Sequence, residues 1–139
     1  MKTIKTTIPA ILLLLFCVNC FAQSKQSDNN LNKKVQQIFE YNNTQNWKAL
    51  RNSFADTMQI FSLNGVALIN NPDTLMAFYK ANYQKFPKEH STIEQTIIIG
   101  NKIIVKEKIT GHGNAPVYDV LIFEFKDNKI VSAWIIFEK

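Results

Sequence analysis

Two carboxylates, Glu107 and Asp119, offer the best candidate for chemistry in this sequence. Glu107 stands in a strand-like row that is otherwise apolar, with Ile103 and Val105 before it. If the loop that follows spans 111–115, an antiparallel hairpin places Glu107 directly opposite Asp119. Two carboxylates facing each other in a partly apolar site cannot both ionise at low cost, so one keeps its proton near neutral pH. The pair would then supply an acid and a base side by side.

The alternative is that neither acid has a catalytic role. A change of one residue in the loop shifts the register, and either acid would then lie at the solvent-exposed rim beside a lysine. His90 and His112 fall in predicted loops, without a second His, Cys or acidic residue at metal-ligand spacing. We therefore expect no metal site and no cofactor. His112, between two glycines, is expected to be a solvated loop histidine, although it could alternatively reach a ligand.

Three predicted helices would support these strands. The first starts near Leu31 with an apolar stripe at helical spacing. The second is short and begins after Asn46, which is a good N-cap, and the strand that follows it begins at Met58. The third begins at Asn71-Pro72-Asp73, with a cap, a proline in the first position and an acid against the helix dipole. It ends near Phe86.

Alternation and turn signals predict six strands in the rest of the chain. Asn64-Gly65 between two apolar runs predicts a tight hairpin, because both residues tolerate positive φ. The predicted strands are 58–63, 66–69, 91–99, 103–110, 117–126 and 130–138.

The last two strands are largely apolar on both faces. A sheet that helices cover on one side normally has a polar second face, so this second face needs another cover. A second subunit is the simplest one, and the alternative is the tail or a stray helix. The homodimer we expect forms through Tyr118, Val120, Ile122, Trp134 and Ile136.

The amino-terminal residues have the features of a cleaved signal peptide. Lys2 and Lys5 precede an apolar run, and Cys20 and Ala22 supply small residues three and one before a cut. We therefore expect a secreted or periplasmic protein; the alternative is a lipoprotein acylated at Cys20. The expected organisation is a signal peptide at 1–22, a disordered lead-in at 23–30 and one domain at 31–139.

Removing this leader changes the composition of the domain. Both cysteines leave with it, so the domain has no disulfide, thiolate nucleophile or cysteine metal site. The remaining 14 basic and 11 acidic residues give a net charge of +3, spread along the chain without the basic cluster of a nucleic-acid surface. We expect no nucleic-acid partner. No later apolar run is long enough to span a membrane.

Four short motifs stand in a recognisable order. They are Asn46-Trp47, Phe54-Ala55-Asp56, Phe78-Tyr79 and Asn128-Lys129-Ile130-Val131. With the element order α-α-β-β-α-β-β-β-β, the chain resembles the nuclear transport factor 2 superfamily over residues 31–138, most of all its SnoaL-like and ketosteroid-isomerase-like proteins. The resemblance implies an α+β fold in which a curved mixed or antiparallel sheet wraps three helices as a cone with an apolar pocket, usually dimeric. Members include isomerases, cyclases, dehydratases and many proteins with no known reaction.

Steroid isomerase chemistry needs groups that this chain lacks. The resemblance implies a carboxylate base and an oxyanion hole made from a tyrosine and a protonated aspartate. Counting along the chain places Ser62, Ile38 and Leu121 at those three positions. That activity is therefore not supported.

Three functions remain open. The chain is an exported domain that binds a small apolar molecule without an assignable reaction, an isomerase-, dehydratase- or cyclase-type enzyme using Glu107 and Asp119 as acid and base, or a non-catalytic protein-interaction module. The expected ligand-binding residues come from the family position counted to Ser62, from the inner rows of the late strands as the resemblance orients them, and from the polar stripe of the third helix. These are Ser62, Tyr79, Asn82, Tyr83, Leu121, Phe123, Ala133 and Ile135.

Overall fold

The computed structural model describes residues 29–137. The predicted signal peptide, Cys20 and most of the predicted lead-in lie outside the described residues. The first helix is present from residue 29, two residues before the predicted start, and extends to residue 43. The elements that follow are α2 (Trp47–Asn52), β1 (Phe54–Ser62), β2 (Ala67–Ile69), α3 (Pro72–Lys85), β3 (His90–Ile99), β4 (Lys102–Thr110), β5 (Val117–Lys126) and β6 (Lys129–Phe137).

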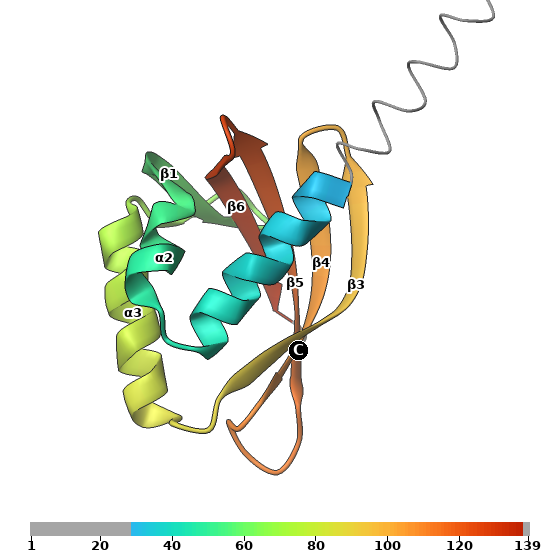
Figure 1. Ribbon diagram of the computed structural model, residues 1–139. Coiled ribbons are helices and arrows are strands. Elements are labelled where there is room, and N and C mark those ends of the chain that lie inside the picture. Colours follow the sequence, from blue (N-terminus) through green and yellow to red (C-terminus); the bar gives the residue numbers. More distant parts are fainter. Residues whose placement is uncertain (1–28, 138–139) are drawn as a thin grey trace, which may run out of the picture.

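The six strands form one mixed sheet in the order β2-β1-β6-β5-β4-β3. β1 and β6 run parallel, and the other neighbouring strands run antiparallel. The three helices lie against the same side of the curved sheet (Figure 1). This is the predicted α+β architecture, a curved mixed sheet wrapped on three helices.

The core lies between the helices and the inner face of the sheet. The predicted stripe of the first helix is buried, including Val35, Ile38 and Phe39, and it packs with Ile103 and Val105 of β4. Burying one large apolar side chain contributes about 1.5–3 kcal/mol relative to leaving it exposed. The helical and strand periodicities of the sequence therefore identify the two layers that stabilise the fold.

The junction between α2 and β1 differs from the prediction. β1 begins at Phe54, four residues before the predicted Met58. Phe54 pairs in parallel with Ile130 of β6, and the Ile130 amide donates to the Ser53 carbonyl at 2.9 Å. Pairing with a distant strand thus starts β1 earlier than the sequence predicted.

An extra residue in β6 moves one side chain to the other face. Phe123 pairs with Ala133, and Phe125 pairs with Ile130. The partners on β6 are therefore three residues apart, whereas those on β5 are two apart, which is a β-bulge. Ile130, which strict alternation places on the outer face with Trp134, is instead 0% exposed in the core.

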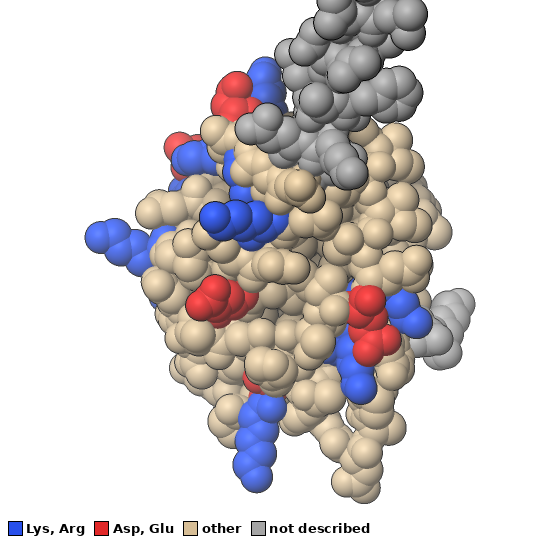
Figure 2. All heavy atoms as spheres, turned by 45° about the vertical axis from the view of Figure 1, so that its right-hand side comes forward, with Lys and Arg blue, Asp and Glu red and all other residues tan. Residues whose placement is uncertain are grey.

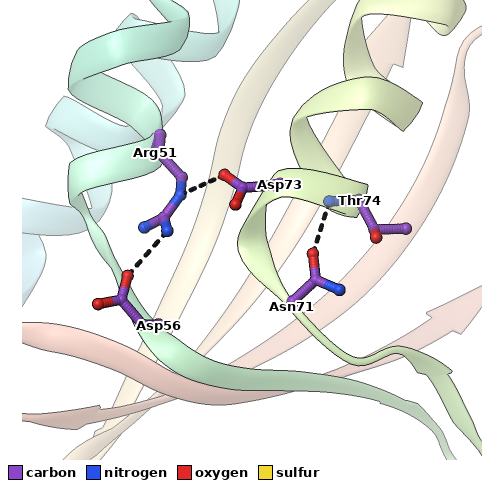
Figure 3. A network of polar contacts seen from close by, with 5 residues as sticks. All are labelled: Arg51, Asp56, Asn71, Asp73 and Thr74. Atoms are coloured by element: carbon purple, nitrogen blue, oxygen red, sulfur yellow. Dashed lines mark hydrogen bonds and ion pairs between the residues drawn. The ribbon is translucent and has the colours of Figure 1, made fainter.

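Arg51 of α2 links the start of β1 to the start of α3 (Figure 3). Its Nη2 lies 2.8 Å from Asp56 Oδ1, and its Nε lies 2.7 Å from Asp73 Oδ1. Hydrogen bonding to the Arg51 guanidinium lowers the pKa of Asp56. The Asn71 side chain accepts from the Thr74 amide at 2.8 Å, which confirms the predicted cap. Because both carboxylates are exposed, the ion pairs orient these elements and contribute little to stability.

One end of the molecule gathers three connections. The C-terminal end of α3, the start of β3 and the β4–β5 loop lie there together (Figure 1). The Asn43 side chain fixes the start of β3 to the first helix, because its Nδ2 donates to the Ser91 carbonyl at 2.8 Å and its Oδ1 accepts from the Ser91 amide at 2.9 Å. The first helix and the start of β3 are thereby held together at this end of the molecule.

Charges are dispersed over the face shown in Figure 2. Lys and Arg side chains stand there singly or next to acidic residues, with uncharged surface between them. Binding nucleic-acid phosphates calls for basic side chains gathered in a patch or stripe, which this face lacks. Among residues 29–137, none of the helices has the length and apolar character needed to cross a membrane.

Candidate functional site

A cavity of about 130 Å³ lies between the helices and the sheet. All three helices and all six strands contribute to its walls, which are mostly apolar. Phe78 of α3 and Phe137 of β6 line it and are also exposed, so they mark its mouth. An apolar cavity of about 150 Å³ is large enough to bind benzene in another protein. This cavity therefore has room for a small molecule of similar size.

Most of the ligand-binding residues expected from the sequence lie at this cavity. Those that line it are Tyr79, Asn82, Leu121, Phe123 and Ile135. The remaining three, Ser62, Tyr83 and Ala133, are placed elsewhere by local packing. Ser62 Oγ is held in the β1–β2 turn, 3.2 Å from the Val66 carbonyl. Tyr83 packs edge-on against Trp47 at 5.5 Å, and Ala133 is buried in the core.

Glu107 of β4 and Asp119 of β5 are paired across the sheet. The predicted register is therefore present, and both side chains face inward and line the cavity. Each residue is only 8% exposed. Two carboxyl groups thus lie in the same largely apolar enclosure, on neighbouring strands.

The environment of Glu107 favours its protonated form. Burial raises the pKa of this carboxyl from 4.5 to about 7, and the nearby charges of Asp119 and Glu89 act in the same direction. A hydrogen bond with the Ser91 side chain opposes the rise by favouring the ionised form. Near neutral pH, Glu107 is therefore able to give a proton to a bound molecule or to take one from it.

A third acid, Glu89, was not found from the sequence. It precedes β3, is 8% exposed and also lines the cavity. Its Oε2 accepts a hydrogen bond from Asn82 Nδ2 and lies 2.5 Å from His112 Nε2. The Phe86 ring stacks on the imidazole at a centroid distance of 4.2 Å. The expectation that His112 is a solvated loop histidine is therefore wrong, because Glu89 and Phe86 hold it in place.

The sequence holds one signal for Glu89 and none for its partner. Glu89 is two residues before Ser91, so the alternation that buries Ser91 extends back to it. The position of His112 depends on contacts with α3 across the β4–β5 loop, which no local pattern reports.

Two further polar groups complete the walls. Tyr79 of α3 lies near the acids, and burial followed by the charges of Glu107 and Glu89 raises the pKa of its hydroxyl. Asn42 of the first helix is 9% exposed, and its side-chain oxygen accepts no hydrogen bond from the described residues. A buried acceptor without a donor is destabilising until a ligand or water supplies one. Within residues 29–137, no three His, Cys, Asp or Glu side chains are arranged to hold a metal ion.

Comparison with known proteins identifies the family. The SnoaL-like domain family matches residues 35–133. No curated protein matches the chain significantly. Among solved structures, an uncharacterised cystatin-fold protein from Novosphingobium aromaticivorans is 16% identical, with a TM-score of 0.69 over 77% of this chain and 97% of that one.

Two further structures have names that refer to reactions. A candidate ketosteroid isomerase from Kribbella flavida is 14% identical, with a TM-score of 0.67 over 80% of this chain and 79% of its own. A candidate polyketide cyclase from Sinorhizobium meliloti is 19% identical, with a TM-score of 0.65 over 75% and 94%. At these identities the likeness establishes the fold alone.

Proposed function

The chain belongs to the SnoaL-like family, and from this premise we propose that its cavity binds a small, partly apolar molecule. The observation that carries the proposal is the cavity of about 130 Å³ with an apolar mouth at Phe78 and Phe137. Binding sites for small molecules are concave and mostly apolar, with a few convergent polar groups that fix orientation. Here Glu107, Asp119 and Asn82 supply such groups.

Filling the cavity is expected to abolish binding. Ile109 of β4 lines the cavity next to the acids, so a phenylalanine there would occupy the space of a ligand. We expect Ile109→Phe to bind cyclohexanol, a neutral probe of suitable size, at least about tenfold more weakly than the wild type. The matched control is Ile97→Phe, at an exposed position of β3. Isothermal titration calorimetry measures both variants; equal affinity of the wild type and Ile109→Phe for cyclohexanol would contradict the proposal.

An acid–base enzyme is the second candidate, favoured by the pKa of about 7 for Glu107 beside Asp119. Isomerases, dehydratases and cyclases each move a proton at a bound carbon skeleton, and a buried carboxyl that titrates near neutral pH suits that task. We expect a bell-shaped pH–rate profile with any true substrate, and a Glu107→Gln protein that binds this substrate but does not convert it. Full turnover in Glu107→Gln would eliminate the residue as the proton-transferring group.

We further propose a homodimer through the outer face of β5 and β6. Tyr118, Val120, Ile122, Trp134 and Ile136 are each only half-buried in the single chain. Desolvating such a face favours association. Analytical ultracentrifugation is expected to give twice the chain mass, and about the chain mass for Trp134→Glu. If the wild type is a monomer, the homodimer proposal is wrong, and a different protein becomes the favoured partner of this face.

Export is proposed on the sequence of residues 1–22 alone. The positive start, apolar run and small residues before Gln23 are typical of a cleaved signal peptide. Mass spectrometry of the protein purified from its native host should give Gln23 as the first residue. A mature chain that begins with lipid-modified Cys20 would replace this proposal with a lipoprotein.

A further inference from the structure

We propose that the molecule bound in the cavity is a small organic cation, an ammonium group attached to an apolar body about the size of a six-membered ring. The proposal rests on small-molecule binding by this cavity and adds the charge of the ligand. It is carried by the distribution of charged, aromatic and hydrogen-bonding groups in the walls.

Acids outnumber bases among the described residues that line the cavity. Glu89, Glu107 and Asp119 all line it, from three separate segments, and each is 8% exposed. No Lys or Arg is among the described residues that line it, and the imidazole that approaches this cluster, His112, contacts Glu89. An anionic ligand would add to the repulsion among the carboxylates, whereas a cation would offset it in an environment where water screens poorly.

Aromatic rings and a buried hydrogen-bond acceptor in the cavity walls also suit an ammonium ligand. Phe39, Phe54, Tyr79 and Phe123 contribute aromatic rings, and a cation over an aromatic face is stabilised by the ring quadrupole. The Asn42 side-chain oxygen, 9% exposed and without a donor among the described residues, lines the same cavity. An ammonium group carries several N–H donors. It therefore satisfies the Asn42 oxygen with one hydrogen bond and a carboxylate with another.

The titration of Glu107 also bears on the charge of the ligand. Among the described residues, Asp119 from β5, Glu89 from the segment before β3 and Ser91 from β3 act on this carboxyl. The Glu107 charge in turn acts on the hydroxyls of Tyr79 and Tyr83 from α3. His112, a basic residue, contacts Glu89. The charges of Asp119 and Glu89 add to burial in raising the pKa of Glu107, and an ammonium group in the cavity would lower it.

Three ligands of the same shape and different charge test the proposal. Cyclohexylammonium, cyclohexanol and cyclohexanecarboxylate are titrated into the purified protein at pH 8 and constant salt by calorimetry. We expect the ammonium ion to bind at least about tenfold more tightly than the alcohol, since charge-assisted hydrogen bonds are the stronger ones, and the carboxylate to bind most weakly. Glu107→Gln should reduce the preference for ammonium over alcohol, whereas Glu94→Gln, at an exposed site on β3, should leave it unchanged.

The remaining outcomes separate this inference from the function on which it rests. If cyclohexanol binds as tightly as cyclohexylammonium, or more tightly, the proposal of a cationic ligand is overturned. Small-molecule binding by the cavity then still stands. The same holds if cyclohexanecarboxylate binds most tightly, or if Glu107→Gln and Glu94→Gln give the same preference as the wild type. If none of the three ligands binds, the proposal of a cationic ligand and the proposed small-molecule function are both overturned.

Discussion

Replacing Gly111 by alanine is expected to lower the free energy of unfolding by about 3 kcal/mol. A Cβ at this position would lie 2.1 Å from the Lys88 carbonyl oxygen and 2.7 Å from the Glu89 amide nitrogen. Both are backbone atoms, which cannot move aside as a flexible side chain can. Gly111 also has a φ of +91°, a conformation that residues with a Cβ rarely adopt. The substitution must therefore displace either the β4–β5 loop or the segment that carries Glu89.

Gly113→Ala is the matched control in the same loop. A Cβ there meets no atom within 4 Å, so we expect a change of no more than about 0.5 kcal/mol. Urea unfolding followed by tryptophan fluorescence measures both variants. If the two substitutions have equal effects, the loop does not pack on Lys88 as described, and the contact between His112 and Glu89 loses its support.

Glu107→Gln is expected to stabilise the protein above pH 7 by about 3 kcal/mol relative to the wild type. The folded-state pKa of about 7 lies above the ordinary value of 4.5, so between these values the folded protein binds a proton that the unfolded chain has released. The wild type therefore loses stability as pH rises from about 4.5 to 7, and the loss is complete above pH 7. Glutamine stays neutral throughout, so this decline disappears.

Unfolding in urea at several pH values between 4 and 8 measures the difference between the two proteins. Glu94→Gln is the control, because Glu94 is exposed on β3 and its loss should leave the pH dependence of the wild type unchanged. Parallel pH dependences for wild type and Glu107→Gln would mean that Glu107 is solvated and ionises normally. The second candidate function would then lose its proton donor.

The strands and their pairing could be predicted because the relevant information is local. Alternation defines the inner row of β4 and β5, and the short loop between them fixes the register that sets Glu107 opposite Asp119. The same reasoning failed at Ile130, where an extra residue in β6 changes the face. Counting against the family pattern gave Ser62 as a ligand-binding residue, but the register of β1 shifts between Ile60 and Phe61 and the chain then turns.

The rest of the site depends on contacts between segments far apart in the sequence. Glu89 follows the end of α3, and its burial requires Asn82 and His112 to reach it. His112 in turn is held by Phe86 and by the close approach of Gly111 to Lys88. Glycine on either side of a histidine suggests only a flexible loop. The packing that holds this loop against the cavity-lining Glu89 appears only when α3, β3 and the β4–β5 loop are brought together.

The titration of Glu107, followed by carbon-13 NMR of its side-chain carboxyl, tests most directly whether this acid lies in an enclosed ligand site. The free protein is expected to show a pKa of about 7 for Glu107. Saturating cyclohexylammonium should lower that value, because the added positive charge favours the ionised carboxyl. A Glu107 that titrates near 4.5 and does not respond to the ligand would contradict both its burial beside Asp119 and its place in a binding cavity.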